Sequence, residues 1–147
     1  MTRYLLDTNI ISNATKHEPS NDLLAWLGGQ ADTDLFIPAL AIAEIWRGIL
    51  QKSPGRKRRD LEKWFAGPEG PQALFAGRVL AFDERAAIEW GRIMAAGTKA
   101  GQPRSALDMI IAAIAMTTEC VLVTDNERDF QNVVACLNPL RPSALPR

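Results

Sequence analysis

A purely aliphatic segment near the C-terminal end of the chain most constrains the fold. Val121-Leu122-Val123 carries no polar side chain, and Cys120 and Thr124 flank it. A strand of this kind is buried on both faces, as in a parallel sheet that helices cover on both sides. Tyr4-Leu5-Leu6 and Leu35-Phe36-Ile37-Pro38 are short apolar segments that also predict strands.

Helical patterns alternate with these strands. Ile42, Ile45, Trp46 and Ile49 recur at three- and four-residue spacing, which predicts an amphipathic helix of roughly 12 residues. Loops are expected at 51–55 and 67–71, further helices at 23–27, 56–65, 84–94 and 105–118, and further strands at 79–82 and 132–137. Strands that alternate with helices predict a three-layer α/β/α sandwich with a mostly parallel central sheet, and 147 residues suit one domain, 1–147.

The counts of charged and metal-binding residues exclude several classes. Seventeen basic and seventeen acidic residues give a net charge of zero, which excludes a protein that coats nucleic acid by bulk positive charge. A single histidine, His17, excludes multi-histidine zinc sites. Cys120 and Cys136 lack zinc spacing and suit a reduced, cytoplasmic protein. No secretory signal is expected, and the apolar run from Met109 to Met116 is far shorter than the ~20 residues that span a bilayer.

Four carboxylates stand where an α/β fold places chemistry. Asp7 ends the first predicted strand, and Asp125 follows Val121-Leu122-Val123-Thr124. Glu44 and Asp108 interrupt helices that are otherwise strongly apolar. Ligands of open α/β sheets bind beyond the carboxyl ends of the strands, and a buried carboxylate is costly unless something neutralises it. Carboxylates without histidine or cysteine favour Mg²⁺ or Mn²⁺.

Each acid also has a purely structural interpretation. Asp7 suits the N-cap of a helix that begins near Ile10, and Glu44 could pair with Arg47 on a solvent face. Asp108 completes Ser105-Ala106-Leu107-Asp108, a variant capping box, and Asp125-Asn126 could form a turn. Whether the four side chains converge is left open by spacing alone.

Four segments, in order, resemble the PIN-domain family and, more narrowly, the VapC and FitB toxin ribonucleases of bacterial toxin–antitoxin pairs. The similarity covers residues 3 to 140 and is carried by residues 4–11, 43–49, 105–115 and 122–130. It implies a metal-dependent endoribonuclease in which Asp7, Glu44, Asp108 and Asp125 bind Mg²⁺ or Mn²⁺ and a metal-activated water hydrolyses RNA. It also implies that Thr8, Asn9, Thr124, Asn126 and Asp129 orient these carboxylates or the water around the metal.

The same interpretation needs positive side chains to hold RNA. Candidates are Arg47, Arg104 and the run Arg56-Lys57-Arg58-Arg59, although such a run usually means a solvated helix face. The resemblance implies a homodimer inhibited by a VapB-like antitoxin, and Trp46, Trp64 and Phe65 are candidates for the groove that the antitoxin fills.

Two other functions stay open. One is an α/β phosphatase or phosphotransfer domain in which Asp7 is the nucleophile, although Asn9 stands where a second acid is expected. The other is a non-catalytic module in which the acids hold a structural ion. A dinucleotide-binding function is excluded because the chain has no GxGxxG motif.

Overall fold

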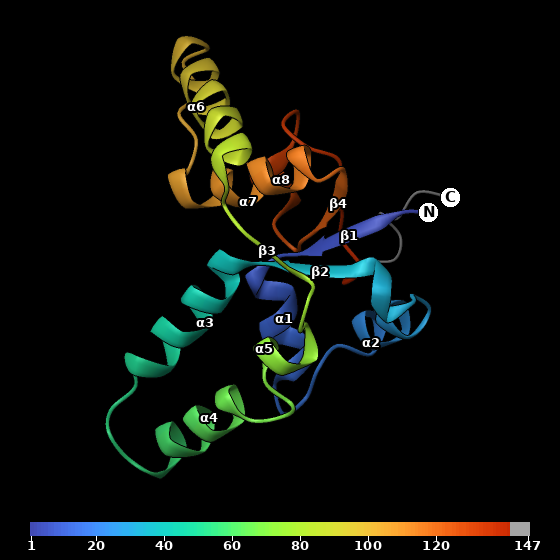
Figure 1. The fold of residues 1–147 in the computed structure, drawn as a ribbon, viewed down its shortest axis with the longest axis vertical. Coiled ribbons are helices and arrows are strands. Elements are labelled where there is room, and N and C mark those ends of the chain that lie inside the picture. The colour runs from blue at the N-terminus through green and yellow to red at the C-terminus, as the bar shows by residue number, and fades with distance from the viewer. Residues whose placement is uncertain (142–147) are drawn as a thin grey trace.

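A five-stranded, fully parallel sheet forms the centre of the computed structural model, which describes residues 1–141 (Figure 1). Its strand order is β3-β2-β1-β4-β5. The strands are β1 (Arg3–Leu6), β2 (Leu35–Pro38), β3 (Val79–Leu80), β4 (Cys120–Val123) and β5 (Cys136–Leu137). The predicted parallel α/β architecture is therefore confirmed for the described residues. Residues 142–147 of the predicted single domain 1–147 lie outside them.

The helices lie on both faces of the sheet (Figure 1). They are α1 (Thr8–Thr15), α2 (Asn21–Gly28), α3 (Ala39–Leu50), α4 (Arg56–Ala66), α5 (Pro71–Leu74), α6 (Glu84–Lys99), α7 (Ala106–Thr117) and α8 (Glu127–Phe130), with a 3-10 turn at Asp32–Asp34. Within residues 1–141, no helix combines the length and the apolar character needed to cross a membrane.

Two hydrophobic cores, one on each face of the sheet, explain the three layers. Leu5 and Leu122 point to one face, where they pack with α6, α7 and α8. Leu6 and Val123 point to the other face, where they pack with α1, α2 and α3. Successive residues of a strand face opposite sides, so the consecutive apolar residues of β1 and β4 fill both cores at once.

Three predicted boundaries were wrong. The stretch 67–71 was expected to be a loop, but Pro71 begins α5, because proline is tolerated in the first turn of a helix. β3 is limited to Val79–Leu80, and the Phe82 side chain beyond it is 40% exposed. The last strand was expected over 132–137, but it spans Cys136–Leu137, where it pairs with the end of β4.

The chain crosses over beside β1, and this crossover positions the site. After β1 the chain builds β2 and β3 on one side, and it then returns to add β4 and β5 on the other side. Leu6 pairs with Val123, and the N–H of Asp7 donates to the carbonyl of Val123 at 2.9 Å. The carboxyl ends of β1 and β4 are therefore level, which brings Asp7 beside Thr124, at the kind of switch point where α/β folds bind ligands.

Candidate active site

Asp7 is the most deeply buried acid of the site, at 6% exposure. It is the N-cap of α1, and its Oδ1 accepts a hydrogen bond from the backbone N–H of Thr8 at 2.8 Å. The predicted cap is thus present, but it occupies one oxygen. The other, Oδ2, accepts from the Thr124 hydroxyl at 2.9 Å and from the Asn9 amide at 3.4 Å. Asp7 is therefore held in one orientation by three neighbours.

Glu44 turns toward the site rather than toward solvent. Its Oε1 accepts a hydrogen bond from the hydroxyl of Thr8 at 2.6 Å, which links α3 to the first residue of α1. An ion pair with Arg47 was the alternative expectation for this glutamate, and it is absent from the described contacts. That alternative is wrong because Thr8, a residue 36 positions away, supplies the partner.

Asp108 lies in the first turn of α7, half-buried beside the site. Ser105 is the N-cap of this helix, and its hydroxyl accepts from the N–H of Asp108 at 3.3 Å. One half of the predicted capping box is therefore present. Within residues 1–141, no hydrogen bond joins the Asp108 carboxylate to the N–H of Ser105. The cap thus uses the backbone of Asp108, while a side-chain hydrogen bond with Ser105 lowers the pKa of its carboxylate and opposes the larger effect of burial.

The pKa values show which acids share one electrostatic environment. Burial raises the pKa of Asp7 to about 6, hydrogen bonds from Thr124 and Thr8 oppose the rise, and the charges of Asp108 and Glu44 add to it. Burial also raises the pKa of Asp108, to which the charges of Asp129 and Glu44 contribute. These mutual effects link Asp7, which follows β1, with Glu44 of α3, Asp108 of α7 and Asp129 of α8. We call them the carboxylate cluster.

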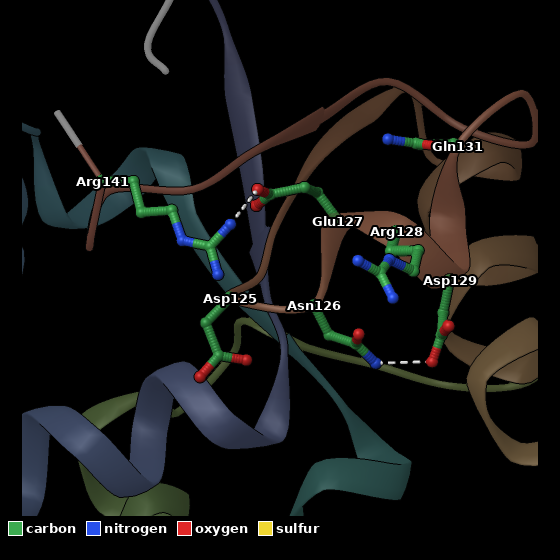
Figure 2. Close-up of a pocket in the computed structure, with 7 residues that line it drawn as sticks. All are labelled: Asp125, Asn126, Glu127, Arg128, Asp129, Gln131 and Arg141. Atoms are coloured by element: carbon green, nitrogen blue, oxygen red, sulfur yellow. Dashed lines mark hydrogen bonds and ion pairs between the residues drawn. The ribbon is translucent and has the colours of Figure 1, made fainter. Parts of the chain in front are cut away.

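Asp125 stands apart from this cluster. Its side chain is exposed and does not contribute to the pKa shift of either Asp7 or Asp108. Figure 2 shows its carboxylate pointing away from the pair formed by Asn126 and Asp129, in which the Asn126 amide donates to Asp129 at 2.7 Å. Asp129 is exposed as well, but its charge adds to the raised pKa of Asp108, whereas that of Asp125 does not.

The carboxylate cluster does not form a preassembled ion cage. In the part of the chain that the structure describes, no three histidine, cysteine, aspartate or glutamate side chains stand close enough to hold one ion as they are. The donor set nevertheless suits a hard divalent cation, because it consists of carboxylate oxygens, and burial first and the neighbouring acids second raise the pKa of Asp7. Asn9 Oδ1 is a further buried oxygen, on the residue whose amide donates to Asp7, and it has no hydrogen-bond partner among the described residues.

Comparison with known families decides the relationship. The model of the PIN domain family matches residues 4–135. The chain belongs to the PIN domain family. Toxin FitB of Neisseria gonorrhoeae is 33% identical over 92% of the chain and 96% of its own length. VapC ribonuclease Y4jK of Sinorhizobium fredii is 31% identical over 95% and 99%. The crystal structure of FitAcB from Neisseria gonorrhoeae has a TM-score of 0.85 and 31% identity, covering 92% of this chain and 97% of that one.

The basic residues expected to hold RNA occupy different positions on this PIN domain. Arg104 donates weakly to the carbonyls of Asp129 and Gln131, at 3.5 and 3.4 Å, so it fastens α8 to the start of α7. Arg58 pairs with Glu62 at 3.0 Å. The remaining candidates are exposed residues of two helices: Arg47 in α3, and Arg56, Lys57 and Arg59 in α4.

A cavity of about 670 Å³ between α1, α3 and α4 opens beside the cluster. Its lining residues include Thr8 and Glu44, through which it adjoins the cluster, and Trp64 of α4. Of the three aromatic residues expected to line the antitoxin groove, Trp64 lines this cavity, whereas Trp46 stacks on the buried Phe65 with ring centroids 4.7 Å apart. The rim carries four basic side chains: Lys16, His17, Lys52 and Lys57.

We call this cavity the basic groove. The sequence pointed to Lys57 as a candidate for RNA binding but not to Lys16 or Lys52. These residues come from separate segments at the end of α1, after α3 and in α4. No local sequence signal groups them, because tertiary structure alone brings these segments to one rim.

Proposed function

We propose that this protein is a metal-dependent endoribonuclease, the toxin of a VapBC-type toxin–antitoxin pair. The observation that carries the proposal is the buried Asp7 carboxylate, whose pKa is raised to about 6 by burial and by the neighbouring Asp108 and Glu44. Perturbed carboxylates at the carboxyl ends of parallel strands are typical of catalytic sites. Among residues 1–141, no ion pair neutralises these acids, so a cation fits there.

Asp7, Glu44 and Asp108 would hold Mg²⁺ or Mn²⁺, with Asp129 or Asp125 as a further contact. Such an ion, when bound, would offset the carboxylate charge and lower the pKa of a water molecule, which favours nucleophilic attack on a phosphodiester. No histidine base is required, which agrees with the single His17 on the rim of the groove.

The chain's own residues supply orientation. The Thr124 hydroxyl and the Thr8 N–H fix both oxygens of Asp7, and the Thr8 hydroxyl holds Glu44. We infer that these contacts keep the metal-binding oxygens aimed at one point, as groups behind a metal ligand commonly do. Asn9 and Asn126 would act in the same way on Asp7 and Asp129.

The relatives support the biological setting. One relative is named a VapC ribonuclease and another a toxin, and both align over more than nine-tenths of this chain. We infer that this chain likewise cleaves RNA, pairs with a VapB-like antitoxin, forms a homodimer and acts in the cytoplasm. The phosphotransfer alternative is less favoured, because hydrogen bonds engage both oxygens of the buried Asp7.

Incubation with RNA tests the proposal. We expect the purified protein to cleave RNA with Mg²⁺ or Mn²⁺ and not with EDTA, and Asp7→Asn and Asp108→Asn to abolish cleavage while the circular dichroism spectrum is kept. Asp22→Asn, an exposed acid in the first turn of α2, is the matched control. Unfolding of Asp108→Asn together with retained activity would show that Asp108 is a structural cap. Absence of cleavage with every metal would leave a non-catalytic metal-binding module, and a phosphorylated Asp7 would favour the phosphotransfer function.

A further inference from the structure

The basic groove has a chemical character that neither the fold nor the carboxylate cluster requires. Lys16, His17, Lys52 and Lys57 line its rim, and all four side chains are exposed. The ion pairs of residues 1–141 are Arg58–Glu62, Arg92–Glu89 and Arg141–Glu127, so none of the four pairs with a carboxylate. Glu44 is the one acidic side chain among the residues that line the groove, so its three lysines give it a local excess of positive charge in a chain with no net charge.

The inner surface of the groove is apolar. Ile45, Leu61 and Trp64 contribute side chains to it, and the cavity is within the size range of ligand-binding pockets. A ligand that satisfies both surfaces needs anionic groups along one edge and flat apolar groups along the other. Single-stranded nucleic acid has this form, because its phosphates can meet lysines while its unstacked bases contact an aromatic side chain.

The position of the groove relates it to the reaction. Glu44 of the carboxylate cluster lines the groove together with Thr8, whose hydroxyl donates to it, so the groove adjoins the cluster. A strand lying in the groove would therefore run directly from the lysines to the acids. We propose that the basic groove binds the single-stranded RNA segment next to the scissile phosphate, with Lys16, Lys52 and Lys57 on its phosphates and Trp64 against a base. This inference rests on the proposed ribonuclease function and specifies where its substrate lies.

Binding of a labelled single-stranded RNA oligonucleotide, followed by fluorescence anisotropy in EDTA at several salt concentrations, tests the proposal. We expect the variant Lys16→Gln/Lys52→Gln/Lys57→Gln to raise the Kd about tenfold or more. The slope of log K against log salt should become shallower by about 2, at about 0.7 for each lost phosphate contact. These lysines are exposed and outside the described ion pairs, so the variant should unfold at the wild-type temperature.

Lys63→Gln is the matched control. Lys63 is an exposed lysine of the same helix, α4, but it does not line the groove. Its Kd and salt slope should equal those of the wild type. Trp64→Leu keeps an apolar side chain and removes the aromatic face, so it should weaken RNA binding and leave the salt slope unchanged.

The outcomes separate this inference from the proposed function. With Mn²⁺, the triple variant should raise KM for RNA and change kcat little, because the lysines do not touch the reacting atoms. If the wild type cleaves RNA and the triple variant binds and cleaves equally well, the groove inference is wrong, and the groove is left for a protein partner. If lysine-dependent RNA binding occurs without cleavage under any metal, the groove inference stands and the ribonuclease function fails. Equal affinity for a duplex of the same length would contradict the single-strand assignment.

Discussion

The two regions beside the carboxylate cluster differ in whether their charged side chains pair with other protein groups. In the basic groove, four basic side chains point to solvent without a carboxylate partner among the described residues. On the other flank, the polar pocket around α8 contains acids and bases that engage each other (Figure 2). There Arg141 pairs with Glu127 at 3.1 Å, and Asn126 donates to Asp129. Charged side chains that pair within the protein stabilise its structure, whereas unpaired ones are available to bind a ligand.

This contrast also shows what a net charge conceals. The chain has as many basic as acidic residues, which excludes bulk nucleic-acid coating but does not describe any one surface. The groove and the α8 pocket differ in pairing, and only a tertiary structure reveals pairing. Variants in each region test whether RNA cleavage depends on the carboxylate cluster rather than on either neighbouring region.

Asp7→Asn should have the largest effect, because it removes a metal-binding charge from the centre of the cluster. We expect kcat/KM for RNA to fall about a thousandfold or more, which corresponds to about 4 kcal/mol of lost transition-state stabilisation. Steady-state cleavage of a labelled RNA with Mn²⁺ measures it. Arg141→Ala on the α8 flank should retain activity within about twofold, since an exposed ion pair contributes little. Equal losses in both variants would contradict the contrast.

The pH dependence of stability should single out the cluster. Because the folded pKa of Asp7 is about 6 and its ordinary value is 3.8, the folded protein binds the proton more tightly than the unfolded chain. Without metal, its contribution to the free energy of unfolding is therefore highest below about pH 4 and falls as the pH rises to about 6. The loss is about 3 kcal/mol.

Urea denaturation in EDTA measures this effect. Asp7→Asn should match the wild type near pH 4 and be more stable than it by up to about 3 kcal/mol at pH 7. Added Mg²⁺ should stabilise the wild type and not the variant. A stability difference that does not vary with pH would show that the pKa of Asp7 is not raised in the folded protein.

Thr124→Val should have an intermediate effect, since it removes the hydroxyl that fixes Asp7 Oδ2. We expect activity to fall about 10- to 100-fold, as is typical for groups that orient metal ligands. Thr124→Ser keeps the hydroxyl and should restore most of the activity at the same Mn²⁺ concentration. Loss of activity in both variants would indicate that packing of the buried Thr124, rather than its hydrogen bond, matters.

The smallest effect should distinguish Asp129, a member of the carboxylate cluster, from Asp125, which stands apart from it. Asp129 contributes to the raised pKa of Asp108, whereas Asp125 contributes to neither shifted acid. We expect Asp129→Asn to reduce cleavage by about tenfold and Asp125→Asn by about twofold, as single charges near a partly solvated site do. Cleavage rates of the two variants, measured side by side, check this order. The reverse order would support Asp125 as a metal ligand.

The sequence predicted the fold well because apolar strands and amphipathic helices are local patterns. Val121-Leu122-Val123 indicated a doubly covered strand, and both faces of β4 are packed. Short elements were less predictable: β5 is fixed by pairing with β4, and α5 begins at a proline that also suits a loop. Local sequence does not contain these long-range contacts.

The residues of the site were likewise predictable where the signal is local and not where it depends on long-range contacts. Strand ends pointed to Asp7, and an acid in an apolar helix pointed to Asp108, because burial of charge is visible in sequence. The partner of Glu44 was not visible, since Thr8 lies 36 residues away and the nearby Arg47 seemed the simpler choice. The basic groove was missed for the same reason, because its lysines come from three separate segments.

Anomalous diffraction from a crystal soaked in Mn²⁺ shows which side chains bind the ion. We expect a manganese peak within coordination distance of carboxylate oxygens of Asp7 and Asp108, with Glu44 or Asp129 joining them, and loss of this peak in the Asp7→Asn variant. A peak bound by the α8 pocket alone, or no ordered manganese at a concentration that supports RNA cleavage, would contradict this expectation.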